Sequence, residues 1–239
     1  MNPPAAAPDL VLMVQDSVPN ASSQLVQALT RSVRDALAGP LRISPELRAV
    51  DGMSGLRYRQ LLNQLISELP EPRYLEIGSF KGSTLCSAIE GNAVQATVID
   101  NWSEFGGPAG EFYANLSRFK GPRARVSVIE RDFREVDYRT IGRFNVFMFD
   151  GPHLEIDHYD ALMLAAPALD DAFILIIDDW NLAPVRSGTR RALSQLKLYV
   201  DTWIEIRTTL DDTHPAVSWQ NSDWHDGYLC AVLRKDSRT

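Results

Sequence analysis

Acidic residues follow five successive apolar runs of this sequence, and their types and spacing suit a ligand-binding site. The runs end near Glu76, Asp100, Asp132, Asp150 and the pair Asp178–Asp179. Buried carboxylates without partners are costly, so we expect them to meet a cation or the hydroxyl groups of a ligand. His153 follows Asp150 by three residues, and an imidazole titrates near neutrality, so it could accept a proton there.

Two glycines in "YLEIGSFKGST" indicate a tight turn between an apolar run and a helix. Gly78 and Gly82 have the spacing G-x-x-x-G, which allows a ligand to approach the backbone closely. The phosphate-binding patterns G-x-G-x-x-G and G-x-x-x-x-G-K-[ST] are missing from it, which disfavours a dinucleotide or a nucleoside triphosphate. Asp100 ends the second run, where a carboxylate suits the two hydroxyls of a ribose. Taken singly, each residue is explained equally well as a turn glycine or a solvated acid.

The elements that must position these residues alternate along the chain. Strand-like runs occur at 73–77, 96–100, 125–129, 145–150 and 173–178, with helical patterns between them at 83–90, 110–119, 155–168 and 187–199. This alternation predicts an α/β fold, a mostly parallel sheet with helices on both faces, and ligands bind at the carboxyl ends of its strands. Two final runs, 202–210 and 227–235, have no helix between them and are predicted to pair antiparallel.

The N-terminal region, 1–52, is predicted to be an extension of a single domain that spans 53–239. Residues 1–19 are rich in Pro and Ala and are expected to form a mobile arm. An amphipathic helix is expected over 20–39, with Leu25, Leu29, Val33 and Leu37 on one face. This helix could cover the core or form a homodimer with a second subunit, and the sequence does not separate the two.

The composition is that of an ordinary globular protein. Among 239 residues, 45% are hydrophobic, and the net charge of −7 argues against nucleic acid as a partner. Cys86 and Cys230 are expected to be buried free thiols. The first residues, "MNPPAAAPDL", lack the pattern of a secretory signal, and the longest apolar run, 172–177, is too short to cross a membrane. We therefore expect a cytoplasmic protein without a membrane partner.

The stretch "LEIGSFKGST" resembles the first motif, E/D-x-G-x-x-x-G, of class I S-adenosylmethionine-dependent methyltransferases. It is especially similar to catechol O-methyltransferase and its caffeoyl-CoA and macrolide-sugar relatives, over about 53–235. The resemblance implies a Rossmann-like, doubly wound seven-stranded sheet with an antiparallel last strand. It places the amino-acid end of the cofactor along 76–82, the ribose at Asp100 and the adenine between Asp132 and Phe133. The residues expected to bind S-adenosylmethionine are Glu76, Gly78, Ser79, Phe80, Gly82, Ser83, Thr84, Asp100, Asn101, Trp102, Asp132, Phe133 and Asp150.

The same resemblance implies a site for Mg²⁺ or another hard divalent cation. In these relatives one Asp ends the fourth strand, and an Asp followed by Asp or Asn ends the fifth. Asp150, Asp178 and Asp179 match that pattern, and the gap of 28 (178 − 150) is similar to the family's spacing. A hard cation takes oxygen ligands and could orient a substrate hydroxyl and lower its pKa. The alternative is that the Asp178–Asp179 pair caps the next helix and Asp150 is a ribose or loop ligand.

His153 matches the position of the general base in these relatives, although it could also be a loop residue that only hydrogen-bonds the turn. Glu155 stands where many relatives have Tyr, so the residues that line the substrate site of the relatives cannot be assigned to this segment. His158 is expected on a helix surface. The 211–226 loop, with His214, Trp219, Trp224 and His225, could close over the substrate or form an ordinary hairpin or an oligomer contact. Trp102 and Trp180 could line the pocket or belong to the core.

Three functions remain open at this point. The leading hypothesis is a metal-dependent O-methyltransferase that acts on a small hydroxylated molecule such as a sugar, polyketide or phenol. The second is a metal-independent methyltransferase of the same fold that uses His153 alone or methylates nitrogen. The third is a non-catalytic binding protein that keeps the cofactor fold. A nicotinamide-dependent oxidoreductase is the least favoured, because the glycine fingerprint is missing.

Overall fold

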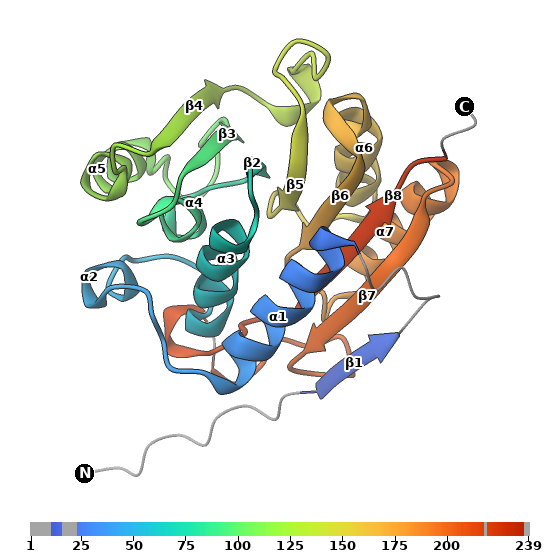
Figure 1. Ribbon diagram of the computed structural model, residues 1–239, viewed down its shortest axis with the longest axis horizontal. Helices are drawn as coiled ribbons and strands as arrows, with labels where there is room; N and C mark the ends of the chain where they lie inside the picture. Colours follow the sequence, from blue (N-terminus) through green and yellow to red (C-terminus); the bar gives the residue numbers. More distant parts are fainter. Residues whose placement is uncertain (1–10, 16–22, 218, 237–239) are drawn as a thin grey trace.

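The computed structural model describes residues 11–15, 23–217 and 219–236, and it shows one sheet flanked by helices (Figure 1). The eight strands have the order β1-β7-β8-β6-β5-β2-β3-β4. Their bounds are β1 Val11–Gln15, β2 Arg73–Ile77, β3 Val94–Asp100, β4 Ala124–Glu130, β5 Phe144–Phe149, β6 Leu169–Ile177, β7 Tyr199–Arg207 and β8 Tyr228–Arg234. The helices are α1 Gln24–Ala38, α2 Pro45–Arg48, α3 Leu56–Glu68, α4 Ser83–Ile89, α5 Ala109–Phe119, α6 Glu155–Ala165 and α7 Ala183–Gln195.

The sheet is parallel from β4 through β6 and reverses at β8. β8 pairs antiparallel with both β6 and β7, as predicted for the last strand. The Rossmann-like, doubly wound α/β class is confirmed, and β1 adds one strand to the expected seven by pairing antiparallel with β7. The expectation of a mobile arm is therefore wrong for 11–15, because this short apolar segment pairs with an edge strand that would otherwise present unpaired backbone groups. Residues 1–10 and 16–19 of that arm lie outside the described part of the chain.

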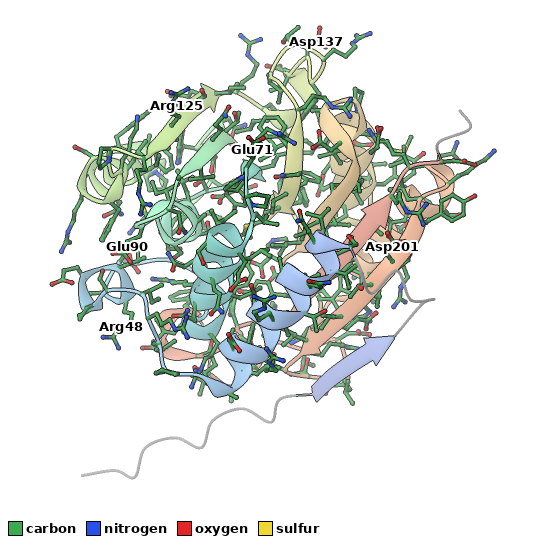
Figure 2. All side chains as sticks on the ribbon, viewed as in Figure 1. Arg48, Glu71, Glu90, Arg125, Asp137 and Asp201 are labelled. Carbon is green, nitrogen blue, oxygen red and sulfur yellow. The ribbon has the colours of Figure 1, made fainter. Side chains whose placement is uncertain are left out.

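Helices cover both faces of the sheet, which explains why the central strands are apolar on both sides. On one face, α1, α3, α4 and α5 pack over strand side chains such as Tyr74 and Val146. On the other face, α6 and α7 pack over side chains such as Leu75 and Phe147. Charged side chains such as Arg125 and Asp137 are exposed at the periphery (Figure 2).

The helix expected over 20–39 forms as α1 and buries its apolar face within the same chain. Leu29 and Val33 are buried in the cluster that also contains residues of α3 and β8. The extension is thus part of the common core, and the homodimer stays a prediction. None of the helices in the described residues is long and apolar enough to cross a membrane.

One edge of the sheet concentrates unusual backbone conformations. Eight described residues other than glycine have a positive φ, and three of them directly follow parallel strands: Phe80 at 49°, Trp102 at 47° and Asp179 at 53°. Such conformations are uncommon for residues with a Cβ and cluster at functional sites. Because β8 runs antiparallel, the loop before it reaches this same edge, where the carboxyl ends of β2, β3, β5 and β6 lie.

Candidate functional site

A cavity of about 850 Å³ opens at the carboxyl edge of the sheet. It is lined by nearly all the residues that the sequence singled out: Gly78, Ser79, Phe80, Ser83, Thr84, Asp100, Asn101, Trp102, Asp132, Phe133, Asp150, His153, Asp178 and Asp179. Glu76 and Gly82 do not line it. The tertiary structure therefore brings the predicted cofactor residues and the predicted metal and base residues to one cavity.

Glu76 lies behind the first turn and supports it from within the core. Its carboxylate accepts hydrogen bonds from the hydroxyls of Tyr74 (2.5 Å), Ser79 (2.7 Å) and Thr84 (3.0 Å). Burial raises the pKa of Glu76 to about 7, and these three donors oppose the rise. Glu76 was predicted to touch the cofactor, but the structure gives it a positioning contact with Ser79 and Thr84, which do line the cavity.

The two glycines hold the turn in a shape that other residues would not allow. Gly78 has φ +83°, and a Cβ there would collide with the carbonyl oxygen of Asp150 at the end of β5. Gly82 has φ +81° at the start of α4, where a Cβ would lie 3.0 Å from the ring of Phe112. The first turn can therefore pack against the neighbouring strand end only with glycine at position 78.

Asp100 fixes the backbone on two sides of the predicted ribose position. Its carboxylate accepts from the backbone N–H groups of Ser79 (2.7 Å), Phe80 (3.0 Å) and Trp102 (2.8 Å). The Trp102 indole N–H in turn donates to the Phe80 carbonyl at 2.8 Å. Asp100 remains half-buried at the cavity wall, so the group predicted to bind the ribose also shapes the turn that would hold the rest of the cofactor.

At the other end of the cavity, Asp150 and Asp178 lie in contact. The Asp178 carboxyl hydrogen-bonds the Asp150 carboxylate, and burial together with the neighbouring acids raises the pKa of both groups well above the usual range. Two carboxylates this close are stable only if they share a proton or a cation. The pair therefore suits a shared proton or a bound cation, and the metal site stays a prediction.

Asp179, the third predicted metal ligand, is directed elsewhere. Its Oδ2 lies 3.0 Å from Nε2 of His153, and its side chain is buried. Burial raises the pKa of Asp179, and the nearby His153 opposes the rise. His153 itself is part-exposed at the cavity wall, which leaves its ring accessible to a ligand.

The loop before β8 supplies a further carboxylate, Asp226, to the cavity. Asp226 Oδ2 lies 2.8 Å from Nδ1 of His214 and 3.2 Å from Nε2 of His225, and all three residues line the cavity. Among the described residues, one group of three could hold a metal ion, and it consists of Asp179, His225 and Asp226. The expectation that this loop reaches the substrate region had a basis in its histidines, but Asp226 was missed. The reversed direction of the last strand was the available indication, because it returns "WHDG" to the acidic strand ends.

His158 and Trp180 correct two expectations. His158 is buried at 1% exposure against the edge of the Phe149 ring, not on a helix surface, and burial lowers its pKa to about 3. It shares a helical face with the buried Ala161, Leu162 and Ala165, so the helical period predicted its burial. Trp180 is fully buried and does not line the cavity, whereas Trp102 does.

Residues 75–180 match the family model of a methyltransferase domain. Three solved structures share the fold. TrmN from Thermus thermophilus is 14% identical with a TM-score of 0.53, and the match covers 80% of this chain and 52% of that chain. The O-methyltransferase from Bacillus cereus in complex with S-adenosylhomocysteine is 16% identical with a TM-score of 0.50 and coverages of 91% and 93%, and the O-methyltransferase TomG from Streptomyces achromogenes in complex with S-adenosylmethionine is 16% identical with a TM-score of 0.50 and coverages of 93% and 92%. This chain thus spans about half of TrmN and most of the other two. No curated protein matches the sequence.

The glycine turn lies within the segment that matches a methyltransferase domain, and this segment forms the parallel part of the Rossmann-like sheet.

Proposed function

We propose that the protein transfers the methyl group of S-adenosylmethionine to a hydroxyl of a small molecule, with His153 as the general base. The observation that carries the proposal is the pairing of His153 Nε2 with Asp179 Oδ2 at 3.0 Å, on the wall of the same cavity that contains the cofactor turn. Two structures that share the fold are O-methyltransferases. The expected acceptors, a sugar, a polyketide or a phenol, all carry such a hydroxyl.

The part of the cavity around the glycine turn, called the cofactor end below, would hold and orient the methyl donor. The backbone from Gly78 to Phe80 lies open to the cavity, Asp100 would accept from ribose hydroxyls, and Asp132 and Phe133 would border the adenine. When bound, S-adenosylmethionine supplies an electrophilic methyl group. What remains for the protein is to align the acceptor oxygen with that methyl group and to remove its proton.

His153 is arranged to take this proton. The Asp179 carboxylate accepts from Nε2–H, which fixes the tautomer with the lone pair on Nδ1. Nδ1 can then accept the proton of the acceptor hydroxyl, and the adjacent carboxylate stabilises the imidazolium that results. Asp179 thus acts through His153 as a positioning residue.

A divalent cation such as Mg²⁺ would fit the Asp150–Asp178 pair, whereas Asp179, the third expected ligand, contacts His153 instead. Two buried acids in contact have raised pKa values because their charges are not neutralised. A hard cation would replace the shared proton and would supply an electrophilic site for the acceptor oxygen. The metal-independent alternative is supported by the contact of Asp179 with His153, since a base held in this way needs no metal.

The test is a calorimetric titration of S-adenosylmethionine into the protein with magnesium present. We expect saturable one-to-one binding that is lost in Asp100→Ala, because three backbone N–H groups also lose their acceptor. Asp100→Asn is the matched control, since its amide oxygen can still accept from the turn, and it should retain weakened binding. The absence of heat up to millimolar cofactor would sink the proposal and favour a non-catalytic protein. With binding established, methyl transfer in a panel of hydroxylated acceptors, with and without a chelator, separates the two mechanisms.

A further inference from the structure

Three groups from two distant segments converge beside the proposed base. Asp179 follows β6, whereas His225 and Asp226 precede β8, and one ligand atom from each lies within 4.8 Å of the other two. Their exposed fractions are 5%, 8% and 2%. The segments are locked together by backbone hydrogen bonds from Trp180 N–H to the Gly227 carbonyl (3.1 Å) and from Asn181 N–H to the Asp226 carbonyl (2.8 Å). The convergence is therefore a fixed feature of the fold.

Two carboxylate oxygens in this group lack a hydrogen-bond donor. Among the described residues, no donor hydrogen-bonds Oδ1 of Asp179 or Oδ1 of Asp226, and neither atom is accessible to solvent. Buried carboxylate oxygens are normally hydrogen-bonded or bound to a metal. A water molecule or an ammonium group is too large to reach atoms that solvent does not touch, whereas a bare metal ion is smaller. Ligand atoms around a tetrahedral ion are about 3.3–3.6 Å apart. His225 Nε2 lies 3.2 Å from Asp226 Oδ2 and 4.0 Å from Asp179 Oδ1, which is close to this spacing.

We propose that Asp179, His225 and Asp226 form a binding site for a divalent transition-metal ion, separate from the Asp150–Asp178 pair. One imidazole nitrogen and two carboxylates favour Mn²⁺, Co²⁺ or Zn²⁺ over Mg²⁺, which prefers oxygen ligands alone. Asp179 can serve this site through Oδ1 while Oδ2 stays with His153. The proposal goes beyond methyl transfer and does not depend on it.

The hydrogen bonds of His225 predict a structural response to the metal. Its Nδ1 accepts the backbone N–H of Trp219 at 3.2 Å, so the neutral ring carries its proton on Nε2, which faces Asp226 Oδ2 at 3.2 Å. Coordination through Nε2 moves that proton to Nδ1, where it opposes the Trp219 N–H. Metal binding must therefore displace the backbone at Trp219, whose half-exposed side chain lines the cavity.

The first experiment titrates metal-stripped full-length protein with Co²⁺ alone and records its d–d absorption bands, with Mg²⁺ as competitor. We expect one Co²⁺ per chain to stay bound when excess Mg²⁺ fills the Asp150–Asp178 pair, because Mg²⁺ should bind the new site at least about tenfold more weakly. Loss of outer-shell partners costs about 10–100-fold in metal affinity, so His225→Gln and Asp226→Asn should each weaken Co²⁺ binding at least about tenfold. Asp223→Asn is the matched control, because it makes the same chemical change in the same loop at a half-exposed carboxylate that does not line the cavity, and its Co²⁺ affinity should be unchanged.

A second measurement leaves the three proposed metal-binding residues unchanged. Zn²⁺ should change the tryptophan emission of the wild-type protein, and Trp219→Phe should abolish that change. Unchanged Co²⁺ affinity in both His225→Gln and Asp226→Asn, or its loss in Asp223→Asn, would overturn the proposal, as would wild-type protein that binds neither Co²⁺ nor Zn²⁺. Cofactor titration of each variant serves as the folding control. It also separates this proposal from the proposed function, because a protein that binds Co²⁺ without S-adenosylmethionine refutes only the latter.

Discussion

The two ends of the cavity treat their acidic groups differently. At the cofactor end, Glu76 and Asp100 accept hydrogen bonds from three hydroxyls and three backbone N–H groups, respectively. At the acceptor end, Asp150 and Asp178 face one another, and Asp179 and Asp226 each keep an oxygen without a donor among the described residues. The first end is satisfied by the protein itself. The second requires a proton or a cation, so control of the reaction should reside there.

The difference follows from how far apart the contributing segments are. Most of the cofactor end comes from 76–84 and 100–102, where one turn can be satisfied by its own side chains and amides. The acceptor end draws its groups from the ends of β5 and β6 and from the loop before β8. Acidic groups from separate segments meet there only after the sheet has formed.

The largest effect should come from His153→Ala, which tests whether the two ends have separate tasks. General base catalysis contributes about 10²–10⁴-fold, so kcat for an acceptor found in the hydroxylated panel should fall by that factor. The affinity for S-adenosylmethionine should change less than about threefold, because His153 is not among the residues expected to bind the cofactor. Stopped assays and calorimetry measure the two quantities. A variant that loses cofactor affinity instead would contradict the division.

A smaller effect is expected from His158→Leu, which tests how much the burial of this imidazole near the acceptor end lowers the free energy of unfolding. The pKa of His158 falls from 6.5 in the unfolded chain to about 3 in the fold, so its contribution to stability is present above pH 6.5 and is lost as pH falls toward 3. At pH 4 this loss is roughly 3 kcal/mol, and the apolar variant avoids it. Urea unfolding at pH 4 and pH 7 should show that the advantage of the variant grows on acidification. Parallel curves for the two proteins would indicate that His158 has a charge partner in the fold.

The smallest effect should come from Trp219→Ala, which concerns only the acceptor side. The Trp219 side chain is 49% exposed at the cavity wall, so its removal costs partial apolar contact with an acceptor. We expect KM for the acceptor to rise about fivefold, equivalent to about 1 kcal/mol, with kcat and cofactor affinity nearly unchanged. Steady-state kinetics with each substrate varied separately makes the test. An increase in KM for S-adenosylmethionine would place Trp219 at the cofactor end instead.

Much of the fold was predictable because the strands have a clear apolar pattern. β2 has the expected bounds, and the helices begin within four residues of the expected positions. β6 begins four residues before the expected start, at Leu169, because Asp170 and Asp171 interrupt its apolar pattern although the segment is in the sheet. The sequence does not predict β1, because four apolar residues beside a Pro-rich start carry too little pattern to identify an edge strand.

The sequence by itself determined the class of the protein and the contents of its first turn. Local spacing alone specifies a glycine turn between a strand and a helix, with an acid at the next strand end. The tertiary structure decided which acids meet. It joined Asp150 to Asp178, turned Asp179 toward His153 and brought Asp226 into the same cavity. These contacts depend on the strand order and on the reversal of β8, which no local pattern encodes.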